Sequence, residues 1–158
     1  AAMNRALALA TGEYIASLDS DDLWLPGKTA AQLAAFAADP ALDLVFALYR
    51  DFVSPELPPG RITPGARDLG VRPGPLFGSL LARRSAFAAA GGFPENLRVG
   101  QFLDWLARAR ALGLRELTLP LHVLDRRIHG ANTTMRSPAA GRDYLLALKS
   151  HLDRRRAA

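Results

Sequence analysis

Three carboxylates lie within four residues at the point where an apolar segment ends. Asp19, Asp21 and Asp22 follow the segment Tyr14–Leu18, and Gly12 permits a turn just before it. The pattern predicts a short buried strand with the acids at its C-terminal end, where open α/β sheets bind ligands. Carboxylates this close repel one another unless a cation or water screens them, and their oxygen atoms suit Mg²⁺ or Mn²⁺. The alternative is a turn in which the acids cap backbone N–H groups, and the local pattern favours neither.

The composition is that of one globular domain with a positive net charge. The 158 residues are 49% hydrophobic and 22% charged, which suffices for a single core. Because the sequence has no cysteine, disulfides, thiolate metal sites and a cysteine nucleophile are excluded. The net charge of +5 attracts phosphates, nucleic acid or an anionic membrane surface. No signal peptide and no apolar stretch of about 18 residues is recognisable, and we expect a cytoplasmic protein that can contact the cytoplasmic face of a membrane peripherally.

Helix-forming and strand-forming segments alternate along the chain. Helices are expected at 2–10, 28–38, 86–90 and 101–112, and a last helix is expected from Ser137 onwards. Strands are expected at 14–18, 42–52, 78–83 and 115–128, the last interrupted by Pro120. The alternation predicts an α/β sandwich with mixed strand directions, in which the proline-rich and glycine-rich segment 54–75 is an irregular loop.

Apolar spacing indicates which sides of these helices are buried. Ser85 is expected to cap the helix that begins at Ala86. The side chains expected to face the core are Leu33, Phe36, Phe102, Leu106, Ala109, Tyr144, Leu145, Leu148 and Leu152.

Six segments, taken in order, resemble a known enzyme family. They are Asn4–Ala16, Asp19–Asp22, Leu23–Lys28, Gly78–Phe93, Gly100–Arg108 and Arg127–Asn132. Together they resemble the C-terminal part of the catalytic domain of a family 2 glycosyltransferase, which has the GT-A fold. The resemblance runs over most of the chain. It implies a GT-A-type α/β sandwich that lacks its N-terminal nucleotide-binding strands, because the chain opens inside a helix.

The resemblance also implies how the single partial domain, 1–158, is organised. Residues 1–53 would carry the metal motif, and 54–75 would form the irregular loop. Residues 76–136 would carry the acceptor and catalytic part, and 137–158 the C-terminal helix. The implied reaction moves a hexosyl group from a nucleotide-diphospho-sugar to a hydroxyl of a saccharide, a lipid-linked compound or another acceptor, with inversion. The sequence indicates neither the donor sugar nor an oligomeric state.

The resemblance assigns a divalent cation, Mn²⁺ or Mg²⁺, to Asp19 and Asp21, where it would bridge the two phosphates of the donor. His129 would be a third metal ligand or a phosphate hydrogen-bond donor, although a lone histidine in a basic loop is more often solvated. Asn4, Asp19, Arg127 and His129 would contact the donor, and Arg126 would help Arg127 to steady the phosphates.

The catalytic base is less clearly indicated. Family members often carry Glu-Asp where this chain has Gln101-Phe102. Asp104 is then the nearest carboxylate and would remove the proton from the acceptor hydroxyl. The alternative is an ion pair between Asp104 and Arg108, four residues apart on a helix, worth about 0.2–0.5 kcal/mol.

Two rival functions and three further features remain open at this level. A haloacid-dehalogenase-like phosphatase also has D-x-D after a strand but requires Thr or Val where Leu23 stands. A basic nucleic-acid module is suggested by the net charge alone, and we expect no nucleic-acid partner because no such motif is present. Trp24 and Trp105 would either stack on a sugar or base or pack in the core. The basic run at 154–156 would either lie at the solvated end of a helix or attract an anionic membrane.

Overall fold

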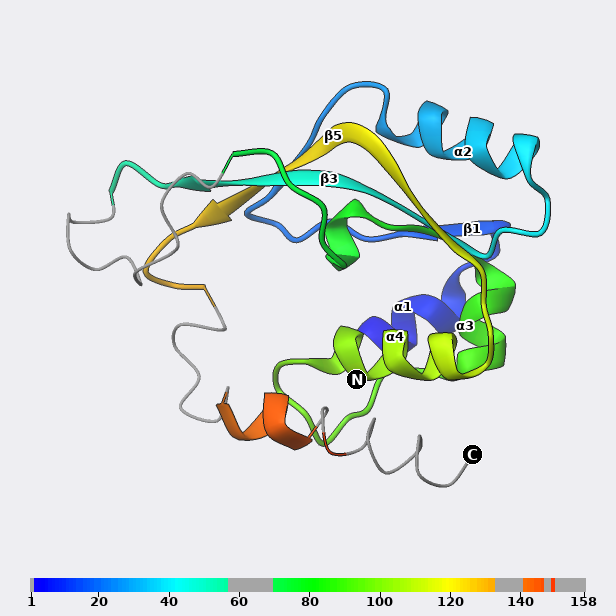
Figure 1. Cartoon of the computed structure of the whole chain (residues 1–158). Coiled ribbons are helices and arrows are strands. Elements are labelled where there is room, and N and C mark those ends of the chain that lie inside the picture. The colour runs from blue at the N-terminus through cyan, green and yellow to red at the C-terminus, as the bar shows by residue number, and fades with distance from the viewer. Residues whose placement is uncertain (1, 57–69, 133–140, 147–148, 150–158) are drawn as a thin grey trace.

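The fold is a five-stranded sheet with helices on both faces (Figure 1). The structure, a computed structural model, describes residues 2–56, 70–132, 141–146 and 149. Helix α2 covers one face of the sheet, and α1, α3 and α4 lie on the other side. The elements are α1 (Ala2–Leu9), β1 (Tyr14–Ala16), β2 (Leu23–Trp24), α2 (Lys28–Ala38), β3 (Leu44–Val53), η1 (Phe77–Ser79), β4 (Leu81–Arg83), α3 (Arg84–Ala90), α4 (Gln101–Ala111) and β5 (Glu116–Ile128). Residues 141–146 are also helical.

The strand order is β1-β4-β3-β5-β2, which makes β1 and β2 the two edges. The central pair β3 and β5 is parallel, whereas the other pairs are antiparallel. The predicted α/β architecture with mixed strand directions is therefore confirmed. Because β1 and β2 are consecutive in sequence but lie at opposite edges, the acidic segment 17–22 connects one edge to the other and ends beside β5, where Leu23 pairs with Asp125.

Strand β5 is continuous over thirteen residues, in contrast to the predicted interruption at Pro120. The register of its pairing with β3 shifts between Ala47, opposite Leu119, and Leu48, opposite His122. Pro120 therefore lies in a bulge, where the missing N–H removes no regular ladder hydrogen bond. This bulge lets the strand continue to the predicted phosphate-binding segment.

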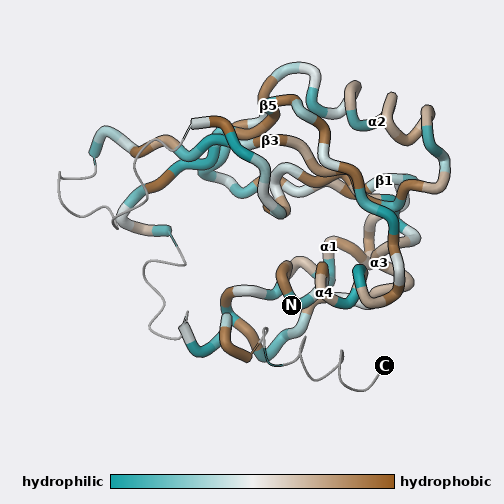
Figure 2. The backbone as a smooth tube through the Cα atoms, viewed as in Figure 1, coloured by the Kyte–Doolittle hydropathy of each residue, from teal (hydrophilic) through white to brown (hydrophobic). Residues whose placement is uncertain are grey.

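The main core lies between the sheet and the helices α3 and α4. Trp105 is fully buried, and its ring stacks on Phe87 with 4.2 Å between the ring centroids. Figure 2 shows the first half of β3 as a mainly hydrophobic segment, and Leu44 and Phe46 from that half belong to this core. For Trp105 the structure therefore supports the core-packing alternative.

Helix α2 is rotated relative to the predicted orientation. Phe36 is buried as expected, but Leu33 is 40% exposed. The face directed at the sheet carries Lys28 and Gln32, spaced four residues apart and both buried. The prediction for Leu33 was wrong because the polar ends of Lys28 and Gln32 reach buried backbone carbonyls that apolar groups would leave without donors.

Three other local predictions differ from the structure. Helix α3 begins at Arg84 and its N-cap is Arg83, so Ser85 lies inside the first turn and does not cap it. The strand expected to start at Gly78 starts at Leu81, because 77–79 form a 3₁₀ turn. Tyr144 and Leu145 are exposed by 37% and 67%, contrary to the predicted buried stripe, whose other members Leu148 and Leu152 lie outside the described residues, as does the basic run 154–156.

Candidate functional site

The acidic segment is attached to the C-terminal end of β5. The backbone N–H of Asp22 donates to the carbonyl of Asp19 at 3.1 Å, which folds the segment into a turn. The Asp22 side chain is buried and its Oδ1 accepts a hydrogen bond from the backbone N–H of Arg127 at 2.9 Å. The expected position of the acids, after a strand, is confirmed, although β1 ends at Ala16 and is only half-buried.

Asp21 meets the segment that follows β5. Its Oδ2 lies 2.7 Å from Nε2 of His129, a residue 108 positions later in the sequence. The side-chain amide of Asn132 donates to the same oxygen at 3.3 Å and to the carbonyl of Arg127 at 3.1 Å. The oxygen of that amide accepts from the backbone N–H of His129 at 2.6 Å. The amide of Asn132 thus closes the turn that holds His129 against Asp21.

The hydrogen bonds of His129 define which ring nitrogen carries the proton. The backbone N–H of Ala131 points at Nδ1 at 3.2 Å, so that Nδ1 acts as an acceptor. In the neutral ring the proton then sits on Nε2, which donates to Asp21. In the other neutral tautomer, with the proton on Nδ1, a lone pair of Nε2 and one of the Asp21 carboxylate would be directed into the same space.

Electrostatics in the turn favour the approach of a cation. Burial raises the pKa of Asp19, and the nearby charge of Asp21 raises it further. Burial also raises the pKa of Asp22 to about 6, with contributions from Asp19 and Asp21, while the hydrogen bond from the Arg127 backbone opposes the rise. The positive charge of Arg126 lowers both pKa values without cancelling the rise.

An open cleft of about 740 Å³ lies beside these groups. Its walls come from the acidic turn, from the end of β3 and from the segment after β5. The lining residues are Ser20, Asp21, Asp22, Leu23, Ser54, Glu56, Arg127, His129, Gly130 and Ala131. Among the described lining residues, the carboxylates Asp21, Asp22 and Glu56 outnumber the guanidinium of Arg127, so this described part of the lining has a negative surplus when the acids are ionised and His129 is neutral.

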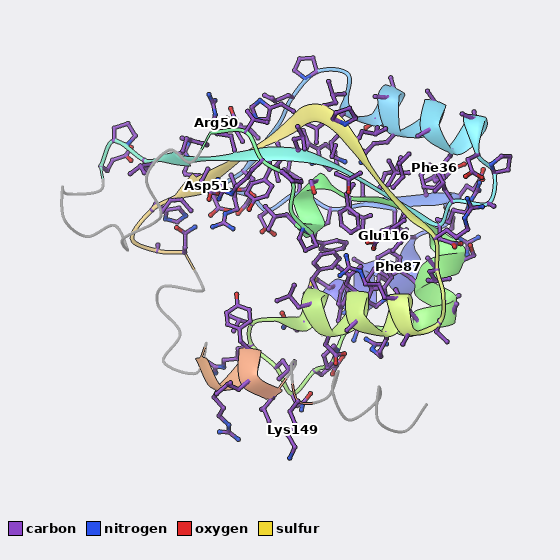
Figure 3. The ribbon with its side chains drawn as sticks, viewed as in Figure 1. Phe36, Arg50, Asp51, Phe87, Glu116 and Lys149 are labelled. Atoms are coloured by element: carbon purple, nitrogen blue, oxygen red, sulfur yellow. The ribbon has the colours of Figure 1, made fainter. Side chains whose placement is uncertain are left out.

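Two arginines at the end of β5 are held by packing and by a buried acid. The guanidinium of Arg127 lies 5.3 Å from the ring centre of Phe52, and within the described part of the chain its buried Nε has no hydrogen-bond partner. Nε of Arg126 lies 3.0 Å from Oδ1 of the buried Asp51, which also pairs with Arg72. Figure 3 labels Asp51 and its sequence neighbour Arg50 in the C-terminal half of β3.

Asn4 lies in a different part of the molecule from the cleft. Its side-chain amide donates to the carbonyl of Phe93 at 2.9 Å and accepts from the Phe93 N–H at 2.8 Å. A Cβ added at Gly92 would lie 2.8 Å from the Asn4 side-chain oxygen, so any other residue there would force the Asn4 side chain to shift. Asn4 fastens α1 to the loop after α3, and its role in donor binding stays a prediction.

Asp104 is buried on α4 and pairs with Arg108. Its Oδ2 lies 3.0 Å from Nε of Arg108, the ion pair that the helical spacing offered as the alternative. Arg108 also donates to the carbonyls of Ala90 and Gly92, the latter at 2.6 Å. The pair therefore joins α4 to the end of α3. Asp104 is not among the residues that line the cleft, and its role as the base stays a prediction.

Trp24 is partly exposed beside the buried amine of Lys28. Its indole N–H donates to the carbonyl of Gly78 at 2.8 Å, and Nζ of Lys28 lies 4.6 Å from the ring centre. These contacts fix β2 against η1. Trp24 therefore has a structural role in this contact, although 37% of its surface is exposed to solvent.

The side chains present fit a divalent cation if the substrate supplies further ligands. In the part of the chain that the structure describes, no group of three His, Cys, Asp or Glu side chains is arranged around one point. Asp21 and His129 nevertheless offer one oxygen and one nitrogen, and Mg²⁺ commonly binds one or two carboxylates together with substrate phosphates. Mn²⁺ accepts imidazole more readily than Mg²⁺ does.

Comparison with known families decides between the functions left open. The sequence model of Glycosyl transferase family 2 matches residues 1–91, more than half of the chain. The chain belongs to glycosyltransferase family 2. The α/β sheet with its mixed strands is accordingly a GT-A-like fold. No curated protein matches the sequence.

The family match for this glycosyltransferase ends at residue 91. It includes Asp19, Asp21 and Asp22 but ends before α4 and β5, so it does not support the predicted roles of Asp104 and His129. The family assignment favours a sugar transferase over the phosphatase and nucleic-acid alternatives. Among the helices that the structure describes, none combines the length and hydrophobicity needed to span a bilayer.

Sequence reasoning missed several residues of the site. Glu56 and Ser54 line the cleft but come from the irregular segment, which carries no periodic signal. Asp51 was missed because a single acid in a strand has no motif around it. Asn132 stood in the segment that resembles the family, three residues after His129, and that spacing was the available signal.

Proposed function

We propose that the cleft binds the diphosphate of a nucleotide-sugar and that the enzyme transfers the sugar to an acceptor hydroxyl. The contact of 2.7 Å between Asp21 and His129 carries this proposal, because it joins the acidic motif to the basic segment that follows β5. Family membership supports the reaction class. The hexosyl group, the inverting course, the saccharide or lipid-linked acceptor and the cytoplasmic location are parts of the proposal.

Asp21 and His129, with Asp19 close by, would hold a Mn²⁺ or Mg²⁺ ion. When bound, such an ion acts as a Lewis acid that neutralises charge on the departing diphosphate. The negative surplus of the described lining residues supports this assignment, since Asp21, Asp22 and Glu56 would otherwise repel a diphosphate.

The arginines would position the other side of the diphosphate. Arg127 lines the cleft, and its guanidinium, which packs on the ring of Phe52, would donate to a phosphate oxygen. Arg126 is held by Asp51 and is close enough to the acidic turn to lower the pKa of Asp19 and Asp22. Charge-assisted hydrogen bonds to phosphate are among the strong ones, so both residues would orient the leaving group.

Calorimetry tests this proposal on the full-length protein. Titration with UDP and with GDP, in the presence and absence of Mn²⁺, should show Mn²⁺-dependent binding of one of them. Asp21→Asn should abolish the Mn²⁺-dependent part, because it removes the charge while keeping the shape. Glu116→Gln is the matched control, since Glu116 is at the start of β5 and pairs with Arg110. Unchanged binding by Asp21→Asn would mean that the acids only cap a turn.

A further inference from the structure

The two groups proposed to hold the cation come from segments that the sheet does not align directly. Asp21 lies in the acidic turn before β2, and His129 follows the last residue of β5. Neither residue belongs to a strand, so backbone pairing does not fix the distance between their side chains. Because a metal site needs its ligands held within about 0.5 Å of the productive arrangement, other residues must supply that alignment.

The side chain of Asn132 joins both segments. Its Nδ2 donates to Oδ2 of Asp21 at 3.3 Å and to the carbonyl of Arg127 at 3.1 Å. Its oxygen accepts from the backbone N–H of His129 at 2.6 Å. One amide therefore connects the acidic turn to the end of β5 and to the residue that carries the imidazole.

A closed turn holds Asn132 itself in place. Its backbone N–H donates to the carbonyl of His129 at 3.1 Å, so residues 129–132 form a β-turn. Inside this turn, the N–H of Ala131 points at Nδ1 of His129 at 3.2 Å. The imidazole and the amide are thus parts of one small hydrogen-bonded unit, and the amide links that unit to Asp21.

The direct contact between Asp21 and His129 cannot maintain this arrangement when both groups bind a cation. A nitrogen that ligates a metal must be free of its proton, so cation binding by both groups would replace the 2.7 Å hydrogen bond between them. The hydrogen bonds of Asn132 need no such exchange, because its amide is neutral and keeps its protons. They can therefore set the spacing of the two groups with and without the cation.

We propose that Asn132 is a positioning residue of the cation site, an inference that rests on the function proposed above. Asn132 is not among the described residues that line the cleft, so it acts through its two neighbours and does not touch the diphosphate. Its loss leaves the carboxylate of Asp21 and the imidazole of His129 present but no longer aligned. The expected signature is a weaker cation site in a protein that still binds the nucleoside diphosphate when the cation is abundant.

Asn132→Leu in the full-length protein tests the proposal, because leucine has a similar shape and makes none of the three side-chain hydrogen bonds. Calorimetry with UDP and with GDP at a series of Mn²⁺ concentrations gives the Mn²⁺ concentration at half-maximal binding. That concentration should rise about 10–100-fold, the usual loss when a residue that orients a metal ligand is removed. At saturating Mn²⁺ the affinity for the diphosphate should return to that of the wild type. Asn132→Ala, which removes the same bonds without adding apolar surface, provides the measurement if Asn132→Leu does not fold.

Gln101→Leu is the matched control. Gln101 also carries a partly buried amide, which donates to the carbonyl of Leu97 at 2.7 Å, and it is not among the described residues that line the cleft. The variant loses an amide of the same chemistry in another part of the molecule. Its Mn²⁺ concentration at half-maximal binding should equal that of the wild type.

A double variant tests whether Asn132 acts through its neighbours. His129→Ala should weaken the cation site by itself, since it removes one of the two groups that Asn132 aligns. In His129→Ala combined with Asn132→Leu, the rise in the half-maximal Mn²⁺ concentration should be smaller than the product of the two single effects. Effects that simply multiply would mean that Asn132 acts independently of His129 and would overturn the proposal.

Two other results would overturn it as well. One is an unchanged half-maximal Mn²⁺ concentration in Asn132→Leu. The other is a loss of diphosphate binding that saturating Mn²⁺ does not restore, because Asn132 would then support the fold or touch the diphosphate. If the wild type binds neither UDP nor GDP with Mn²⁺, the proposed function itself fails, which is distinguishable from a wild type that binds normally and a variant that does the same.

Discussion

Replacing Gln32 by methionine should destabilise the fold strongly, because one buried amide joins α2 to the sheet. Its Nε2 donates to the carbonyl of Val45 at 2.7 Å and to that of Ser79 at 2.9 Å. Its Oε1 accepts from the buried Nζ of Lys28 at 2.8 Å. Methionine has a similar volume, so the loss is mainly one of hydrogen bonds and not of packing.

The expected magnitude follows from these three contacts. A hydrogen bond between neutral groups contributes about 1 kcal/mol net, and one to a charged group about 1.5–3 kcal/mol. Two neutral bonds and one charged bond therefore sum to about 4 kcal/mol of unfolding free energy. For a chain of this size, a loss of about 4 kcal/mol lowers the melting temperature by roughly 8–16 °C.

Urea unfolding followed by circular dichroism measures the loss, and a double-mutant cycle with Lys28→Met tests its cause. Burial lowers the pKa of Lys28 to about 8, so the amine is already in an unfavourable environment and depends on its partners Gln32 and Leu80. The double variant should be less destabilised than the sum of the single variants, by about 0.5–3 kcal/mol, because no buried charge is left without its amide partner. Additive effects, or a loss below about 1 kcal/mol for Gln32→Met, would refute this reasoning.

Two further predictions concern the acidic turn and the attachment of α1. The pKa of Asp22 is raised from 3.8 to about 6 in the folded state. At a pH between these two values, the folded protein therefore keeps a proton on Asp22 that the unfolded chain has lost. Without added metal, the stability of the wild type relative to Asp22→Asn should therefore fall as the pH rises from about 4 to about 6, and a flat difference in urea midpoints would contradict this. Asn4→Ala should lower the unfolding free energy by about 2 kcal/mol, because it removes two hydrogen bonds to Phe93. Calorimetric binding of UDP or GDP with Mn²⁺ should stay unchanged. Weakened binding at unchanged stability would instead favour the predicted contact of Asn4 with the donor.

The parts of the fold that carry a local signal could be predicted from the sequence. Helix α2 matches the expected bounds 28–38 because Pro26 and Asp39-Pro40 limit it from both sides. The acids follow β1 as expected because the change from apolar to charged residues is abrupt. The orientation of α2 could not be predicted, since it depends on carbonyls of Val45 and Ser79 that come from distant elements.

Residues of the candidate site could be predicted only where they belong to a recognisable sequence motif. Asp21 and His129 were both proposed from the family resemblance, and the structure brings them together. Glu56 was not foreseen, because its position depends on the hydrogen bond from Ser54 to Ile128, which joins segments far apart in the sequence. Asp104 shows the opposite case, in which a local spacing of four residues correctly offered the ion pair with Arg108.

One short acidic segment connects the two edge strands of the sheet, and this connection affects the order in which the chain folds during synthesis. Strand β2 is near the start of the sequence, yet its only pairing partner in the described sheet is β5, near the other end. During synthesis β2 and the acidic turn must wait until β5 has left the ribosome, whereas α2 can already form. Contacts over such long separations close late, because the entropy of loop closure must be overcome first. The cleft should therefore be the last part to assemble, and a nascent chain that ends before Asn132 should contain helices without binding a nucleoside diphosphate.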